Sequence, residues 1–243
     1  MGNWRVRMAD DSKGETHLQT YPLHLRSGLM FLEHGGLWLI DTGSPTSFSA
    51  RESIELDGAR FGLERSLLGY TADRISELVG FEIAGLLGND VLSELDWQFD
   101  LKAGRATVSA EPLPMEGASI PLDSFMGTPI ISAEVGGGPC RLILDTGAEL
   151  CYFPAEFFRG LAPNGRFRDF NPLLGWFDVD LYSLEARIAS IPFTLRSAPI
   201  PGDAGMLQLA FRMAGATGLA GIQVFLGRSA FYSPRQQRLA LST

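Results

Sequence analysis

The tripeptide Asp-Thr-Gly occurs twice in this chain, and the duplication constrains the fold more than any other feature. The two Asp-Thr-Gly copies lie at residues 41–43 and 145–147. An apolar run leads directly into each aspartate, over residues 37–40 and 142–144. Short apolar runs that end at turn residues are typical of strands buried on both faces. We therefore expect two buried strands, each delivering an aspartate at its end.

A second element also recurs, two apolar residues followed by glycine. It lies at Leu86–Gly88 after the first Asp-Thr-Gly and at Phe225–Gly227 after the second. A hairpin with a polar turn follows each one, at Lys102–Gly104 and at Pro234–Gln236. The same order of elements in both parts of the chain indicates two related halves.

The two halves are joined by a polar stretch, residues 109–119, that holds two prolines and one glycine. Such a composition suits a linker. We place the boundary near residue 115, with an N-terminal lobe over 1–114 and a C-terminal lobe over 115–243. One segment is expected to be helical: Thr71 is a candidate cap for residues 72–80. Most of the rest of the chain is expected to be strand.

Composition excludes several classes of function. The formal net charge is −8 without a basic stripe, so nucleic acid is not expected as a partner. No apolar run reaches the roughly 18 residues that a membrane helix needs, so no membrane association is expected. Cys140 and Cys151 do not make a disulfide framework. The expected location is the cytoplasm, unless a signal segment was trimmed from the sequence.

No metal or cofactor is expected. His17, His24 and His34 lack ligand spacing with each other or with the cysteines. The chain also lacks the Gly-x-Ser-x-Gly elbow of serine hydrolases and a glycine-rich phosphate loop with a lysine.

A pair of carboxylates supports hydrolysis without a covalent intermediate. A single Asp-Thr-Gly is most simply a turn, but two copies in matching contexts point to Asp41 and Asp145 as one catalytic pair. Two adjacent carboxyls do not ionise together easily, so they share a proton. The ionised member then activates water while the other donates a proton to the substrate. The pair titrates as a unit, so the sequence assigns neither role to one aspartate.

The residues beside the aspartates have expected roles of their own. We expect Thr42 and Thr146 to turn inward and hydrogen-bond across the interface of the halves. We expect Gly43 and Gly147 to bring backbone N–H groups near the carboxylates, which favours ionisation of one member.

These motifs resemble those of pepsin-like and retropepsin-like aspartic peptidases, over most of the chain. The resemblance implies an all-β fold of two pseudo-symmetric barrel lobes with the active-site cleft between them. It implies an aspartic endopeptidase that cuts extended peptide or protein substrates without a cofactor. Because both catalytic halves lie in one chain, we expect a monomer.

The resemblance also suggests finer details. Ser44 is similar to a pepsin-type serine whose hydroxyl bonds its aspartate, whereas Ala148 has no hydroxyl. Glu149 and Arg228 match retroviral positions that would form an ion pair beside the cleft; two solvated surface charges are the simpler alternative. Retropepsin-like enzymes also cover the substrate with a β-hairpin.

Neither half carries a clear signature for that hairpin. The candidate in the first half turns at Asp57-Gly58. The candidate in the second half contains Trp176, Phe177 and Tyr182, which are more simply explained as core residues.

Two other functions compete with peptide hydrolysis. A peptide-binding or scaffolding module on the same fold is favoured by the missing hairpin signature, but it has no evident need for two aspartates. A glycosidase needs carboxylates about 5 Å or more apart, and the symmetric motifs argue against that spacing.

Overall fold

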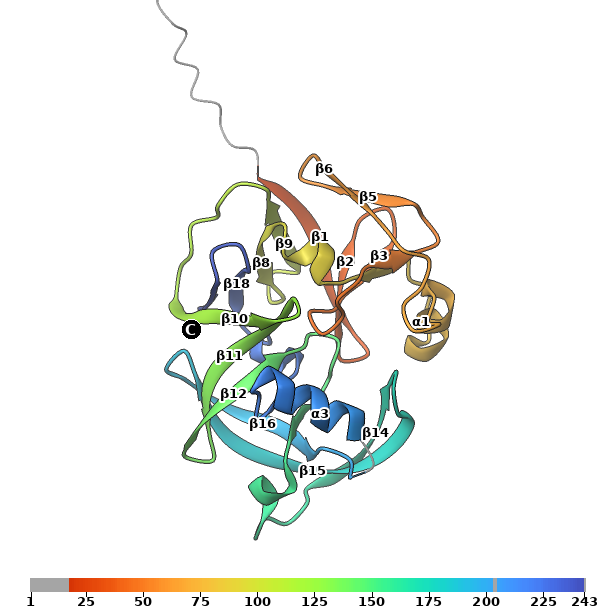
Figure 1. The fold of residues 1–243 in the computed structure, drawn as a ribbon. Coiled ribbons are helices and arrows are strands. Elements are labelled where there is room, and N and C mark those ends of the chain that lie inside the picture. Colours follow the sequence, from red (N-terminus) through yellow and green to blue (C-terminus); the bar gives the residue numbers. More distant parts are fainter. Residues whose placement is uncertain (1–17, 203–204, 243) are drawn as a thin grey trace, which may run out of the picture.

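The structure is a computed structural model that describes residues 18–202 and 205–242, and it is mostly β, as expected (Figure 1). The elements before the linker are β1 (Gln19–Arg26), β2 (Leu29–Glu33), β3 (Leu37–Ile40), β4 (Phe48–Ser49), β5 (Ser53–Leu56), β6 (Ala59–Gly62), α1 (Ala72–Val79), β7 (Gly85–Leu87), α2 (Asn89–Leu92), β8 (Asp96–Asp100) and β9 (Arg105–Ser109).

The elements after the linker are β10 (Ala118–Phe125), β11 (Thr128–Val135), β12 (Gly138–Leu144), β13 (Cys151–Phe153), the 3₁₀ helix η1 (Ala155–Phe158), β14 (Gly165–Asn171), β15 (Gly175–Ile188), β16 (Ile191–Pro199), α3 (Gly205–Ala214), β17 (Gly218–Ala220), the 3₁₀ helix η2 (Ile222–Val224), β18 (Ser229–Ser233) and β19 (Arg238–Leu241). The proposed boundary near residue 115 falls in the strand-free segment between β9 and β10.

The predicted helix and the predicted hairpin turns are confirmed. Helix α1 begins after Thr71, whose side chain accepts a hydrogen bond from the N–H of Arg74, and it ends at Gly80 in the left-handed conformation. The three expected hairpin turns join β5 to β6, β8 to β9, and β18 to β19. Cys140 and Cys151 are both free and buried. No helix in residues 18–202 and 205–242 is long and apolar enough to cross a bilayer.

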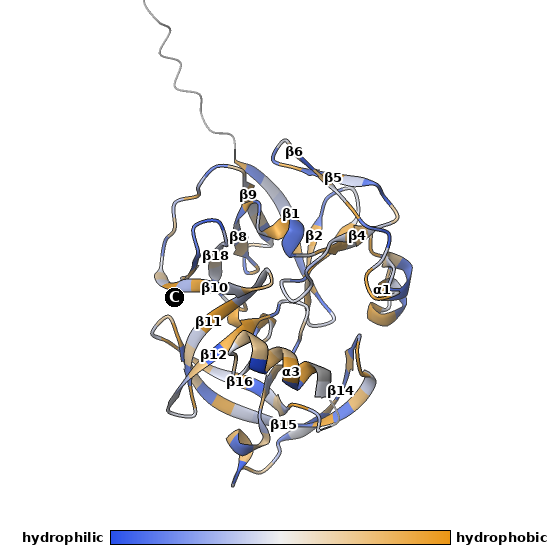
Figure 2. Ribbon diagram, in the orientation of Figure 1, coloured by the Kyte–Doolittle hydropathy of each residue, from blue (hydrophilic) through white to orange (hydrophobic). Residues whose placement is uncertain are grey.

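The strand before each aspartate lies in the same surroundings in both halves. β3 pairs in parallel with β7, which puts Ile40 opposite Leu87, and β12 pairs in parallel with β17, which puts Leu144 opposite Ala220. β3 is buried from Trp38 to Ile40, whereas β12 is buried at Cys140, Leu142 and Leu144 and exposes Arg141 on its other face. Figure 2 shows the apolar stretches of β11 and β12.

The match between Leu86–Gly88 and Phe225–Gly227 is wrong. The counterpart of β7 is β17, so Leu219–Gly221 matches Leu86–Gly88. The glycines explain why: a Cβ on Gly88 would lie 2.8 Å from the Ser44 carbonyl oxygen, and one on Gly221 would lie 2.5 Å from that of Ala148. The backbone after each Asp-Thr-Gly therefore requires glycine there, whereas a Cβ on Gly227 would meet no atom within 4 Å.

An antiparallel sheet draws its strands from both halves. Its strands pair in the order β1, β9, β8, β18, β19 and β10, and the junction between the halves is the pairing of β8 with β18. A continuous buried cluster also runs through both halves, with Trp97 and Tyr232 among its largest members. The two halves therefore share one sheet and one buried core.

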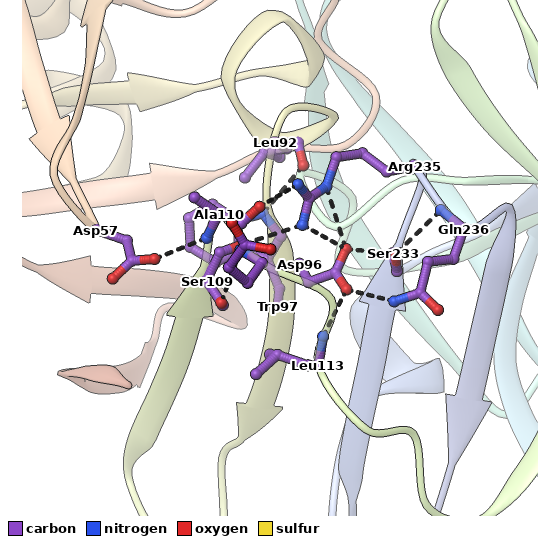
Figure 3. A network of polar contacts seen from close by, with 11 residues as sticks. Asp57, Leu92, Asp96, Trp97, Ser109, Ala110, Leu113, Ser233, Arg235 and Gln236 are labelled. Carbon is purple, nitrogen blue, oxygen red and sulfur yellow. Dashed lines mark hydrogen bonds and ion pairs between the residues drawn. The ribbon is translucent and has the colours of Figure 1, made fainter. Parts of the chain in front are cut away.

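A buried carboxylate ties this shared sheet to the linker (Figure 3). Asp96, at the start of β8, is only 1% exposed. It accepts hydrogen bonds from the N–H of Leu113, the hydroxyl of Ser233 and the side chain of Gln236, and pairs with Arg235 at 3.1 Å. Because every donor lies outside the first 109 residues, Asp96 joins the first half to the linker and to the β18–β19 turn.

Candidate active site

Each aspartate is fixed at the end of its strand by the same backbone bond. The N–H of Asp41 donates to the carbonyl of Leu87 at 3.0 Å, and the N–H of Asp145 donates to the carbonyl of Ala220 at 2.9 Å. The parallel pairs β3–β7 and β12–β17 thus continue for one more residue into each Asp-Thr-Gly. Both aspartates are half-buried.

The two threonines exchange hydrogen bonds between the halves, as expected. The hydroxyl of Thr146 accepts from the N–H of Thr42 at 3.0 Å and donates to the carbonyl of Ile40 at 2.7 Å. The hydroxyl of Thr42 accepts from the N–H of Thr146 at 3.0 Å and donates to the carbonyl of Leu144 at 2.6 Å. Both threonines are fully buried, so these four bonds fix how the two motifs sit against each other.

The two glycines let each motif approach the carboxylate of the other. A Cβ on Gly43 would lie 2.4 Å from Cγ of Asp145, and one on Gly147 would lie 2.5 Å from Cγ of Asp41. No real side chain fits at such a separation, so both positions need glycine. The reciprocal contacts place the two carboxyls face to face, with a hydrogen bond between them.

Burial and mutual repulsion make the pair hold a proton. Burial raises the pKa of Asp145 well above its usual range, and the negative charge of Asp41 raises it further. Burial also raises the pKa of Asp41, but backbone donors and the hydrogen bond from Asp145 oppose that rise. The result favours a singly protonated pair that titrates as a unit.

The carboxylate of Asp41 accepts one more backbone N–H hydrogen bond than the carboxylate of Asp145. Oδ1 of Asp41 accepts from the N–H of Gly43 at 2.9 Å and from the N–H of Ser44 at 3.0 Å. Oδ1 of Asp145 accepts from the N–H of Gly147. The expected bond from the Ser44 hydroxyl is wrong, because that hydroxyl donates to the carbonyl of Thr46 at 2.9 Å.

The proposed ion pair of Glu149 with Arg228 does not form among the described residues. Glu149 pairs with Arg196 of β16 at 2.6 Å. Arg228 lies over the ring of Phe193 at 4.2 Å, and its Nε donates to the carbonyl of Leu226. The error has the same origin as the mismatch of Phe225–Gly227: Arg228 does not follow the glycine that packs against the second Asp-Thr-Gly.

Sequence reasoning missed three further residues close to the motifs. The side chain of Asn89 donates to the carbonyl of Thr42 at 2.6 Å and so supports the first motif. Its counterpart after Gly221 is Ile222, which has no polar group. The hydroxyl of Tyr152 donates to Asp169 of β14, and the charge of Asp169 adds to the rise in the pKa of Asp145. No sequence signal connects Tyr152 with Asp169, because only the path of β14 brings them together.

Of the three second-half aromatics expected in the core, two pack against it and one does not. Phe177 and Tyr182 are partly buried and pack against core clusters, but Trp176 is 50% exposed. Across the part of the chain that the structure describes, no group of three or more His, Cys, Asp or Glu side chains is placed to hold a metal ion.

No protein-family model matches the chain, and no curated protein matches it. Among solved structures, the chain is similar to the solution structure of simian foamy virus (mac) protease, with 17% sequence identity and a TM-score of 0.28. The match covers 38% of this chain and 87% of that chain. This is a coarse resemblance, so the site geometry must support any proposed function.

Proposed function

We propose that the protein is an aspartic endopeptidase of the single-chain, two-lobed kind, with Asp41 and Asp145 as its catalytic pair. One observation carries the proposal: the reciprocal contacts of Gly43 and Gly147 with the opposite carboxylates. A fold needs no such arrangement for stability, because bringing two half-buried carboxyls together costs free energy unless they share a proton.

The geometry suits activation of water. A water between the carboxyls gives a proton to the ionised Asp41 as its oxygen attacks the peptide carbonyl carbon. Asp145 gives its proton to the carbonyl oxygen. The C–N bond of the tetrahedral intermediate then breaks as Asp41 passes its proton to the leaving nitrogen and a hydroxyl of the intermediate returns a proton to Asp145, so the pair is again singly protonated. The second backbone donor on Asp41 favours this assignment.

Substrate and architecture follow from the same proposal. The substrate is an extended peptide or protein segment lying between two lobes, 1–114 and 115–243. The repeated parallel pairings of β3 with β7 and β12 with β17 support the two-lobed interpretation.

The direct test is cleavage of a mixed peptide library by the wild type, Asp41→Asn and Asp145→Asn. We expect cleavage by the wild type at acidic to neutral pH, inhibition by a statine-type transition-state analogue, and loss of at least about 10³-fold in each variant, because one carboxyl alone supplies only half of the acid–base chemistry. Asp123→Asn is the matched control, because that carboxylate is 61% exposed.

Cleavage that persists in both variants would exclude the pair. A folded wild type that binds peptides and cuts none at any pH would instead favour the non-catalytic binding module.

A further inference from the structure

A row of three side chains lies across the second-half sheet beside Asp145. Ile143 pairs with Leu219, and Leu219 pairs with Tyr152 on its other side. Side chains of directly paired residues point to the same face of a sheet, and all three belong to one apolar cluster. Asp145 follows Ile143 by two residues and continues the same pairing, because its N–H donates to the carbonyl of Ala220. Its carboxylate therefore leaves the sheet on the face that carries Tyr152.

Asp169 of β14 lies against this face. Its carboxylate accepts hydrogen bonds from the hydroxyl of Tyr152 and from the N–H of Phe170, the latter at 2.7 Å. Phe167, two residues earlier on the same side of β14, packs against the apolar cluster of the row. Beyond the effect of burial, the negative charge of Asp169 also raises the pKa of Asp145. The two carboxylates therefore share one polar environment.

The strand that carries Asp169 also reaches the first half (Figure 1). The ring of the next residue, Phe170, meets that of Tyr70 edge to face with centroids 5.7 Å apart. The hydroxyl of Tyr70 donates to the carbonyl of Pro172 at 3.4 Å. Because Tyr70 lies just before α1, these contacts join the end of β14 to the half that carries Asp41. Asp169 therefore lies where the halves meet, on the second-half side.

No cation pairs with Asp169 within residues 18–202 and 205–242. The neighbouring arginines of β14 have other partners. Arg166 pairs with Asp180 at 3.6 Å, and Arg168 lies over the ring of Trp176. Asp169 is partly exposed, its two donors are uncharged, and a carboxylate accepts about four hydrogen bonds. Its remaining acceptor positions suit a cationic donor.

The charge around Tyr152 is negative. Glu149, the other acid whose charge acts on Tyr152, pairs with Arg196 at 2.6 Å, so these two charges cancel. The singly protonated carboxylate pair keeps one negative charge. Asp169 adds a second. A cationic side chain is therefore attracted to this place, and an anionic one is repelled.

The same row in the first half is apolar. Leu39 pairs with Leu86, and Leu86 pairs with Phe48, so Phe48 takes the place of Tyr152. The buried members of the surrounding cluster are all Phe, Leu or Ile. The first half therefore offers an apolar surface beside its aspartate, where the second half offers Asp169.

From this asymmetry we propose that the peptidase prefers substrates with a lysine or arginine on the second-half side of the scissile bond, and that Asp169 is the specificity-determining residue that binds the cationic side chain. This inference rests on the proposed peptidase function. The ammonium or guanidinium group of the substrate donates to the Asp169 carboxylate, which the hydroxyl of Tyr152 holds in place. The first-half side takes an apolar side chain against the surface that includes Phe48.

The test uses peptides that carry lysine or uncharged norleucine at each position in turn along one host sequence. For the wild type we expect one position at which lysine raises kcat/KM about ten- to hundredfold over norleucine, as a hydrogen bond between charged groups would do. In Asp169→Asn we expect that ratio to fall to within about threefold of unity. Because one sample cuts both peptides, the ratio does not depend on how much of a variant folds.

Two further variants control for charge and for structure. Asp180→Asn removes the same charge from the same hairpin, at a side chain that is 51% exposed, and should keep the wild-type ratio within about twofold. Asp169→Glu restores the carboxylate and should keep a preference for lysine of at least about threefold. An unchanged ratio in Asp169→Asn, an equal fall in Asp180→Asn, or no position that prefers lysine would each overturn the proposal.

Peptide binding separates this inference from the proposed function. Fluorescence anisotropy of the same peptides, once labelled, measures their Kd without any cleavage. If the wild type cuts no peptide but binds a lysine peptide at least about tenfold more tightly, and Asp169→Asn loses that preference, the peptidase proposal fails and the role of Asp169 stands. Equal Kd values for the lysine and norleucine peptides at every position would overturn the role of Asp169.

Discussion

A single backbone N–H separates the chemistry of the two aspartates. In both halves the N–H after the Asp-Thr-Gly lies 3.3 Å from the backbone carbonyl of the aspartate, but the N–H of Ser44 also donates to the Asp41 carboxylate at 3.0 Å. The difference at this site therefore comes from the direction of one backbone N–H relative to the carboxylate. A serine hydroxyl is not required for it.

The raised pKa of Asp145 has a consequence for stability. A carboxyl whose pKa is raised by folding contributes stability that is complete below its unfolded pKa and is lost as the pH rises through its folded pKa. We expect Asp145→Asn to gain stability relative to the wild type as the pH rises from 4 to 7, because the amide does not ionise. Thermal or urea unfolding at both pH values measures the difference.

Each unit of pKa shift corresponds to about 1.4 kcal/mol of that difference. Asp123→Asn, at an exposed carboxylate, should show no comparable gain. A difference between Asp145→Asn and wild type that shrinks toward neutral pH would contradict the raised pKa.

At the residue level, the sequence identifies the parts of the site that are repeated. Asp41, Asp145 and the two threonines are visible because each occurs in the same context twice. The bonds of Ser44, Arg196 and Tyr152 are not visible, because they depend on the path of the chain between elements and are present in one half only.

At the level of elements, strand type and turn position follow from local pattern, but the matching of elements between halves does not. Leu219–Gly221 and Phe225–Gly227 are both apolar pairs followed by glycine. Only the parallel pairing with β12 and the lack of space for a Cβ at Gly221 distinguish them. The hairpins were likewise predictable as hairpins, whereas which one reaches the other half depends on tertiary contacts.

Asp96 and its partners Leu113, Ser233, Arg235 and Gln236 form the Asp96 cluster. This cluster should contribute more to the free energy of unfolding than any exposed ion pair does. We expect Asp96→Asn to lower the free energy of unfolding by about 1–3 kcal/mol. The amide nitrogen would face N–H and O–H donors whose hydrogen bonds a carboxylate oxygen now accepts. Urea unfolding provides the measurement. Asp123→Asn, which removes an exposed partner of Arg141, should change the same quantity by no more than about 0.5 kcal/mol. Equal effects of the two substitutions would refute the importance of the cluster.

At the scale of the whole molecule, the halves share both a sheet and a core. We expect one cooperative unfolding transition, with calorimetric and van't Hoff enthalpies that agree. Two separate transitions would show that the halves fold independently.

We also expect a monomer of 26.4 kDa in light scattering, because the chain supplies both aspartates itself. A stable dimer would contradict this expectation.

Substitution of the glycines opposite the aspartates would abolish the proposed activity without altering the charge of the protein. A methyl group at Gly43 or Gly147 would occupy the space of the facing carboxylate and push the pair apart. Such a variant would keep every ionisable group of the wild type. It would let partner binding be studied in cells with the electrostatic surface intact, which no aspartate substitution allows.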